Sequence, residues 1–433
     1  MDRKTPPPIS LPQRIDMLPV ERLPLGQHGQ MLVINGGTQD VIRVDVVIEA
    51  GTRYQQTTLQ ARCTNALLTE GTQTASSQQL AEQLDFMGSA IDTATSADFG
   101  IVSLLSTHQH LDRSLQLLAD VLLRPALNQS DLDVLLRKER QAFMVSSERV
   151  ATLARRGFMA AIFGPEHPYG RTAQPADFDA LTRHHVEQFH QSVILRKPIT
   201  ALLSGLVGHR EIDLVTQHLA QGSPRVDKPH IPLPQPTPHG AIRRIHQPKP
   251  DALQSALRIG KATIPRTHPD FPMLLVLNTV LGGYFGSRLM ANLREDKGYT
   301  YGISSALIPY RDACVWSIGT EVGLEHTEAA IAEVLHELER ITQEPLPDHE
   351  LELVKSYLMG ELLRQLDGPF ATADTVNSAL QLNELDLGFV GRVIDSVRTA
   401  TPQQLLALAQ HHFGTEGLVI SVAGGPSQRN ERK

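Results

Sequence analysis

The sequence predicts a protein of the α+β class with two homologous domains, each a mostly antiparallel or mixed sheet flanked by helices. The order of strand-like and helix-like segments in the first half recurs in the second at an offset of about 210 residues, so that Ser77 corresponds to Ser287. A repeat of this length indicates domain duplication, because solenoid repeats are much shorter. In each half, two strand-like segments lie between helices, and a proline-rich segment separates the halves.

Chain length and proline content suggest where the domains end. With 433 residues, the chain is too long for one ordinary hydrophobic core. Prolines cluster in IPLPQPTPHG and HQPKPD, which cannot form a regular helix or a central strand. We therefore predict a first domain at residues 12–221, an extended linker at 222–250 and a second domain at 251–427.

The first clear strand of the first half is Val41–Glu49, where β-branched residues alternate with polar ones. Further strands are expected at residues 89–95, 98–106 and 199–206. Apolar residues at helical spacing predict helices in six other segments. These are residues 58–69, 78–87 (with Gly88 as a plausible C-cap), 111–123, 129–145, 152–163 and 176–191.

The second half repeats this order. The strand expected at Ala252–Lys261 matches Val41–Glu49, and SRLMANLREDKG matches SQQLAEQLDFMG of the first half. Other strands are expected at residues 301–307, 313–320 and 418–425. Helices are expected at residues 271–281, 325–342, 348–365 and 400–413.

Composition excludes several classes of function. The hydrophobic fraction of 41% and the charged fraction of 20% are those of a soluble globular protein. A net charge of −7 argues against a nucleic-acid partner, which favours a basic patch. No apolar run is long enough for a signal peptide or a membrane span. We therefore expect a cytoplasmic protein, or a periplasmic one if the N-terminus is trimmed. Cys63 and Cys314 lie in no paired motif, so we expect two reduced thiols.

One segment of the second half is specific enough to indicate a family. The run GGYFGSRLMANLREDKGYTYGISSAL (Gly282–Leu307) resembles the C-terminal half of pitrilysin-like zinc peptidases, which include insulinase and the mitochondrial processing peptidase. Its most specific part is Ser-Arg-Leu, then Leu-Arg-Glu-x-Lys-Gly, then a tyrosine. The resemblance extends over residues 40 to 425, and it implies a clam-shell arrangement of the two domains.

In that family the first half carries the inverted zinc motif H-x-x-E-H. Two histidines at i and i+4 share a helical face and hold the metal, while the glutamate acts as general base. Counting back from Gly71-Thr72 places Arg62 and Ala66 at the histidine positions and Asn65 at the glutamate. An asparagine cannot accept the proton of water. Our alignment places Ser146 at the later glutamate ligand, with Glu148 close by. We therefore expect no metal on this chain.

The second half, by contrast, keeps its family residues. The resemblance implies that Arg294 and Tyr301 correspond to an arginine and a tyrosine that grip the peptide at the scissile bond. An arginine can hold a carbonyl or carboxylate with forked hydrogen bonds, and a tyrosine hydroxyl can donate to an oxyanion. The alternative is that Arg294 forms a local salt bridge and Tyr301 packs in the sheet.

The leading hypothesis is a non-catalytic subunit that binds peptide and supplies Arg294 and Tyr301 to an active site formed in trans. Its partner would be a zinc-bearing homologue, or a second copy of the chain, and zinc would sit on the partner. The chain itself would need no cofactor. A structural or peptide-binding scaffold with no role in proteolysis is the alternative from a different class.

A third hypothesis is a stand-alone peptidase with an unconventional metal site. His108 and His110, with a distant carboxylate, are the candidates, although two ligands at i and i+2 are a weak signal. In HHVEQFH only Glu187 and His190 share a helical face, so a solvated helix is the simpler interpretation. Cys63 lies within the lost motif, but no neighbouring residue in the sequence would activate its thiol.

Overall fold

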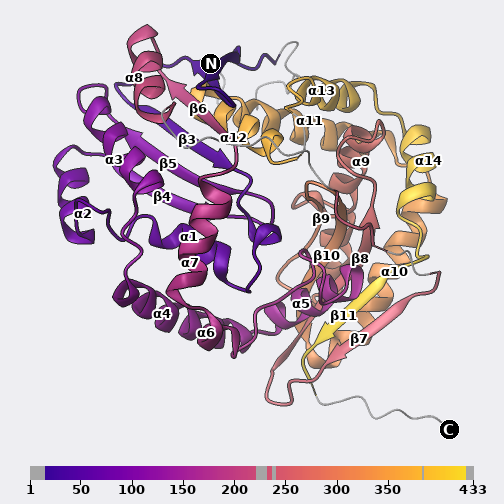
Figure 1. Cartoon of the computed structure of the whole chain (residues 1–433). Coiled ribbons are helices and arrows are strands. Elements are labelled where there is room, and N and C mark those ends of the chain that lie inside the picture. Colours follow the sequence, from indigo (N-terminus) through magenta and orange to yellow (C-terminus); the bar gives the residue numbers. More distant parts are fainter. Residues whose placement is uncertain (1–14, 221–231, 237–239, 383–384, 426–433) are drawn as a thin grey trace, which may run out of the picture.

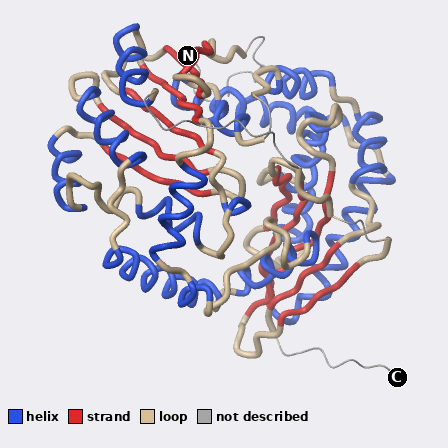
Figure 2. The backbone as a smooth tube through the Cα atoms, viewed as in Figure 1, coloured by secondary structure: helices blue, strands red, loops and turns tan. Residues whose placement is uncertain are grey.

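The computed structural model describes residues 15–220, 232–236, 240–382 and 385–425. Two sheets form two halves that face one another as a clam-shell (Figures 1 and 2). Each sheet is mixed and mainly antiparallel, as predicted, and helices flank both. Much of predicted linker 222–250 lies outside the described residues.

The first sheet has the strand order β1-β2-β6-β3-β5-β4, in which only β2 and β6 pair in parallel. Strands β1 and β2 were not predicted from the sequence. The bounds are β1 Glu21–Leu25, β2 Gly29–Asn35, β3 Ile42–Ile48, β4 Ala90–Thr95, β5 Gly100–Ser106 and β6 Ile199–Gly205. The helices are α1 Gln60–Leu67, α2 Ser77–Phe86, α3 Leu111–Leu123, α4 Gln129–Ser147, α5 Val150–Phe163, α6 Asp177–Ala180, α7 Arg183–Phe189 and α8 His209–Leu219.

The second sheet has the order β7-β11-β8-β10-β9, with a parallel pair of β7 and β11. Strand for strand, this is the order β2-β6-β3-β5-β4 of the first sheet, which agrees with a duplication. The strands are β7 Arg243–Gln247, β8 Gln254–Thr263, β9 Ile303–Pro309, β10 Cys314–Gly323 and β11 Val419–Ala423. The helices are α9 Phe271–Asn278, α10 Thr327–Gln343, α11 Asp348–Gln365, α12 Gly368–Leu380, α13 Phe389–Thr399 and α14 Pro402–His412, with π-helical turns at Thr279–Gly283 and Met290–Asp296.

Strand β7 corrects the predicted linker, since it lies inside residues 222–250. Its five residues contain no proline; Pro248 and Pro250 follow its end. It is also an edge strand, paired only with β11 among the described strands, and an edge tolerates neighbouring prolines better than a central position does.

Apolar residues on one face of each sheet pack against the helices of the same half. In β3, Ile42, Val44, Val46 and Ile48 are buried in one core that also contains leucines of α3. The corresponding core of the second half includes Trp316, which stacks on Phe413 with ring centroids 4.2 Å apart and donates to the Ser305 hydroxyl at 2.8 Å. Each half therefore has a hydrophobic core of its own.

Each half contributes one helix that packs against the sheet of the other half. Helix α5 of the first half packs Phe158 and Ile162 against Val315 and Val419 of the second sheet. Helix α12 of the second half packs against the first sheet in the same way (Figure 1). Its cluster consists of Ala373 and Val376 on the helix and Leu32, Ile34 and Leu202 on the strands. Each half thus buries part of the other, which fixes their relative position.

A buried ionic cluster joins the halves at a second place. The Arg53 guanidinium lies 3.1 Å from the Asp98 carboxylate and 2.6 Å from that of Asp312, in the turn between β9 and β10. The neighbouring Arg311 lies 2.6 Å from Glu49 at the end of β3. Burial acts to raise the pKa of Glu49, but Arg311 and Lys197 together outweigh it, so that the pKa is lowered. The Glu49 carboxylate therefore remains charged and paired at neutral pH.

Arg43 of β3 ties the inner face of the first sheet to α12. Its guanidinium lies 2.8 Å from the exposed Asp374 of α12 and 3.1 Å from the buried Asp45. Burial raises the pKa of Asp45, and Arg43 acts in the opposite direction. Without Arg43 the buried carboxyl would take up a proton more readily, which limits the cost of losing the arginine.

Replacing Arg43 with glutamine is therefore expected to lower the free energy of unfolding by about 2 kcal/mol. Urea denaturation at pH 7 would measure the loss. Arg22→Gln, at an exposed position of β1 in the same sheet, is the matched control and should change stability by less than about 0.5 kcal/mol. An equal loss in the two variants would contradict a specific role for Arg43 in holding α12.

Candidate functional site

Helix α1 carries the three positions that the sequence places in the degenerate motif. Asn65 is buried, and its side-chain amide donates to the Thr95 hydroxyl of β4 at 2.8 Å. Ala66 is half-buried, and Arg62 is exposed. The Arg62 guanidinium lies 2.7 Å from the Glu139 carboxylate of α4. The helix thus presents a cation and an amide where a zinc site would need imidazoles.

Ser146 lies near the C-terminal end of α4, where its hydroxyl donates to the Phe143 carbonyl at 2.9 Å. The carboxylate that reaches α1 is instead Glu139, which sequence analysis did not single out. Glu139 precedes Ser146 by seven residues, two helical turns, so both lie on the same side of α4. That spacing was the signal that could have identified Glu139.

The other candidate residues of the first half have structural roles. Burial raises the pKa of the Cys63 thiol to about 12, so it stays protonated at neutral pH and is a poor nucleophile. The His108 ring lies 2.5 Å from Asp40 and 2.7 Å from the Leu206 carbonyl. Burial lowers the pKa of His190, whose ring lies 2.9 Å from the Leu122 carbonyl.

Potential metal ligands do not cluster in the part of the chain that the structure describes. Within the described ranges there is no group of three or more histidine, cysteine, aspartate or glutamate side chains placed to hold a metal ion. His108 and His110, the candidates for an unconventional site, acquire no third ligand there. The same part of the chain contains no helix that is long and apolar enough to cross a membrane.

Arg294 and Tyr301 lie on either side of a turn in the second half. Arg294 is in the π-helical turn Met290–Asp296, and its guanidinium carbon lies 4.3 Å from the centroid of the Phe285 ring. Tyr301 occupies the bend before β9, and 95% of it is exposed. Neither side chain makes a hydrogen bond or ion pair with another described residue. Neither one therefore forms a hydrogen bond or an ion pair with a described residue of α1.

The backbone around Tyr301 is well anchored even though its side chain is exposed. The neighbouring Thr300 hydroxyl lies 2.8 Å from the Glu321 carbonyl and accepts the Gly302 amide at 3.1 Å. The Thr320 hydroxyl of β10 lies 2.9 Å from the Thr300 hydroxyl. An exposed phenol on a fixed loop is suited to recognition of a ligand, because little backbone entropy is lost on binding.

Two family models match this chain. Residues 30–163 match the insulinase model (peptidase family M16), and residues 180–358 match the model described as the peptidase M16 inactive domain. The chain belongs to the pitrilysin/insulinase superfamily. The predicted family is thereby confirmed, and the inactive-domain match includes Arg294 and Tyr301.

The M16 relatives are distant in sequence. An uncharacterized zinc protease of Mycobacterium bovis is 24% identical over 376 residues, which is 85% of each chain. The mitochondrial-processing peptidase subunit beta of Saccharomyces cerevisiae is 21% identical over 367 residues, 77% of this chain and 76% of the yeast protein.

Solved structures confirm the fold over more than nine tenths of the chain. The peptidase M16 inactive domain from Pseudomonas fluorescens superposes with a TM-score of 0.84 at 21% identity, covering 95% of this chain and 100% of that one. A protease from Helicobacter pylori gives a TM-score of 0.85 at 18% identity, covering 94% and 100%. The M16 architecture of two facing halves is therefore established for this chain.

Proposed function

We propose that this chain is the non-catalytic subunit of a pitrilysin-like peptidase and completes the active site of a zinc-bearing partner with Arg294 and Tyr301. The observation that carries the proposal is the contrast between the two halves. The motif positions of α1 hold Arg62, Asn65 and Ala66, whereas Tyr301 exposes its hydroxyl on an anchored loop. Such a chain can bind a peptide but cannot activate water through zinc.

Peptide binding is supported by an open sheet edge beside α1. Strand β4 is the outermost strand of its sheet, and its residues 90, 92 and 94 are exposed. Thr95 at its end holds Asn65 of α1, so the edge adjoins the motif helix. An open edge can take up an extended peptide as an added strand, with main-chain hydrogen bonds providing affinity without strict sequence specificity.

The partner in this proposal is a homologue with an intact H-x-x-E-H motif, which would form a heterodimer with this chain. The alternative partner is a second copy of this chain. One M16 relative carries the name of a subunit, the beta subunit of the mitochondrial-processing peptidase, which supports a division of labour between chains. A scaffold that binds peptide without contributing to proteolysis is favoured by one contact, the stacking of Arg294 on Phe285, which already gives that guanidinium an intramolecular neighbour.

The test is hydrolysis of a quenched random peptide by this chain alone, by its nearest H-x-x-E-H homologue alone, and by a mixture of the two. Activity is expected only in the mixture, together with a complex in size-exclusion chromatography. A complex without activity would favour the scaffold. Neither complex nor activity would overturn the proposed pairing.

A further inference from the structure

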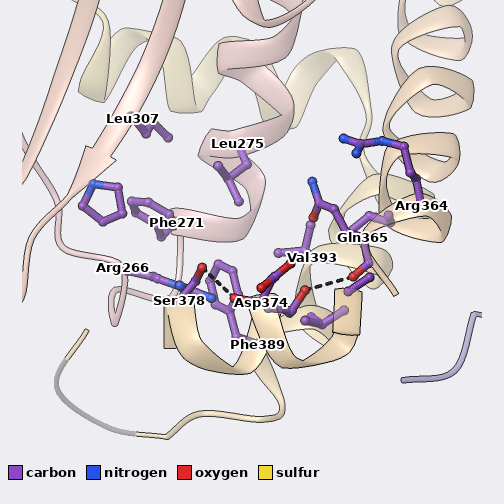
Figure 3. Close-up of a pocket in the computed structure, with 15 residues that line it drawn as sticks. Arg266, Phe271, Leu275, Leu307, Arg364, Gln365, Asp374, Ser378, Phe389 and Val393 are labelled. Carbon is purple, nitrogen blue, oxygen red and sulfur yellow. Dashed lines mark hydrogen bonds between the residues drawn. The ribbon is translucent and has the colours of Figure 1, made fainter. Parts of the chain in front are cut away.

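A pocket of about 500 Å³ lies within the second half, away from α1 and Tyr301 (Figure 3). Its wall is mostly apolar and comes from β9, α9, α11, α12 and α13. Phe271 and Leu275 belong to α9, Leu307 to β9, Leu362 to α11 and Val393 to α13. Such a volume, walled by side chains of several packed elements, is that of a small-molecule site.

Three charged side chains line the pocket, and two of them have partners. Asp374 of α12 is paired with Arg43 at 2.8 Å, and Arg364 of α11 with Glu361 at 2.7 Å. The third, Arg266, lies in the loop before α9 and makes no hydrogen bond or ion pair with any described residue. Among the described residues, the pocket therefore holds one positive charge, that of Arg266, without a carboxylate in direct contact.

Arg266 is held against the apolar wall by an aromatic ring. Its guanidinium carbon lies 3.9 Å from the centroid of Phe389, beside which Figure 3 shows it. Burial lowers the pKa of Arg266; Asp386 acts in the opposite direction, and Arg392 adds to the lowering. Asp386 is itself occupied by a salt bridge with Arg392. Stacking leaves the N–H groups at the guanidinium edge available for an anion.

We propose that this pocket binds a small apolar carboxylate, with Arg266 holding the carboxylate and the apolar wall holding the hydrocarbon. An arginine can bind a carboxylate through two parallel N–H···O bonds, while the apolar wall gains from burying methylene groups. Two sources carry this chemistry: a fatty acid with a chain of roughly ten carbons, or the C-terminus of a peptide that ends in an apolar residue. The site does not depend on the proposed pairing with a zinc-bearing chain.

The site also bears on the contact between the halves. Asp374, Thr375 and Ser378 of α12 line it, while Ala373 and Val376 of the same helix pack on the first sheet. A bound ligand would therefore support α12 from the second half while the first sheet supports its other face. Ligand that binds only the folded protein raises the melting temperature, which provides a readout independent of proteolysis.

The test is calorimetric titration of the whole chain with sodium decanoate below its micellar concentration. One molecule is expected to bind per chain, with a matching rise in Tm. Decanol and decyltrimethylammonium, which share the hydrocarbon, are expected to bind at least about tenfold more weakly, since they lack the negative charge. Acetyl-Leu-Phe and its C-terminal amide test the peptide source, and only the free acid should bind.

Variants distinguish the contribution of the Arg266 charge to decanoate binding from that of the apolar cavity. Arg266→Gln is expected to weaken decanoate binding at least about tenfold, whereas Arg244→Gln, whose arginine lies on β7 outside the pocket and is paired with Glu328, should bind as the parent does. Ser378→Trp, at an exposed lining position, should block the pocket with the charge intact. Equal binding of decanoate and decyltrimethylammonium, unchanged binding by Arg266→Gln, or binding of neither acid would overturn the proposal.

Discussion

Tyr301→Phe is expected to lower the kcat of the complex with the zinc-bearing homologue by about 10²–10³-fold and to leave KM within about twofold. The phenol hydroxyl donates to the oxyanion only when water has attacked the peptide carbonyl, so its loss raises the barrier without weakening substrate binding. The substitution removes one oxygen from a side chain that is 95% exposed, and the fold should be unaffected. Steady-state kinetics on a quenched peptide would measure both constants.

Tyr357→Phe is the matched control. Tyr357 is also exposed, at 39%, and its ring lies tilted against that of Tyr284, with centroids 5.2 Å apart. It should leave both constants unchanged. Arg294→Ala should raise KM as well as lower kcat, because an arginine grips the ground-state peptide too. Full activity of Tyr301→Phe, or an equal loss in Tyr357→Phe, would contradict a role for Tyr301 in the transition state.

Strands with clear alternation were predictable from the sequence. In β3, buried Ile42 and Val44 flank Arg43, and the pattern alone located the strand to within a residue at each end. Strands β1 and β7 were missed because they are short edge strands whose residues are largely exposed or half-buried. Their positions depend on pairing with β2 and β11, which lie nearby only in the folded chain.

The exchange of helices between the halves was beyond local sequence patterns. Helix α12 was not predicted. Its Ala373 and Val376 face the first sheet, while Thr375 and Ser378 line the pocket of the second half. A helix placed between two layers shows no single apolar stripe. The cluster of Arg53, Asp98 and Asp312 could not be predicted because its two aspartates lie in different halves of the chain and meet only in the folded protein.

At the candidate site, residue identities could be predicted but contacts could not. Arg62 and Asn65 were singled out from their distance to Gly71-Thr72. Their partners, Glu139 and Thr95, depend on how α4 and β4 pack on α1. The placement of Ser146 remains a prediction, as does the use of Arg294 and Tyr301 in a shared active site.

Restoring the zinc ligands tests whether α1 is the motif helix of the family. The triple variant Arg62→His, Ala66→His, Ser146→Glu is expected to bind one zinc ion with a Kd of about 1 µM or tighter, equivalent to about 8 kcal/mol. The two imidazoles would share one face of α1, and α4 would supply a carboxylate. Zinc titration by calorimetry, with metal content after dialysis, would measure the gain over the parent chain.

The same variant separates metal binding from catalysis. Asn65 remains in it, and an amide cannot take a proton from zinc-bound water, so the variant should bind zinc without hydrolysing peptide. Cys63 should not compete for the metal, because burial raises the pKa of its thiol to about 12.

Adding Glu139→Gln to the triple variant shows which carboxylate of α4 serves as the zinc ligand. An affinity reduced about tenfold assigns Glu139, whose carboxylate already reaches position 62. An unchanged affinity assigns the carboxylate introduced at position 146, two turns further along α4. If the triple variant takes up no more zinc than the parent, α1 does not carry the family's metal site and the alignment behind the proposed function is wrong.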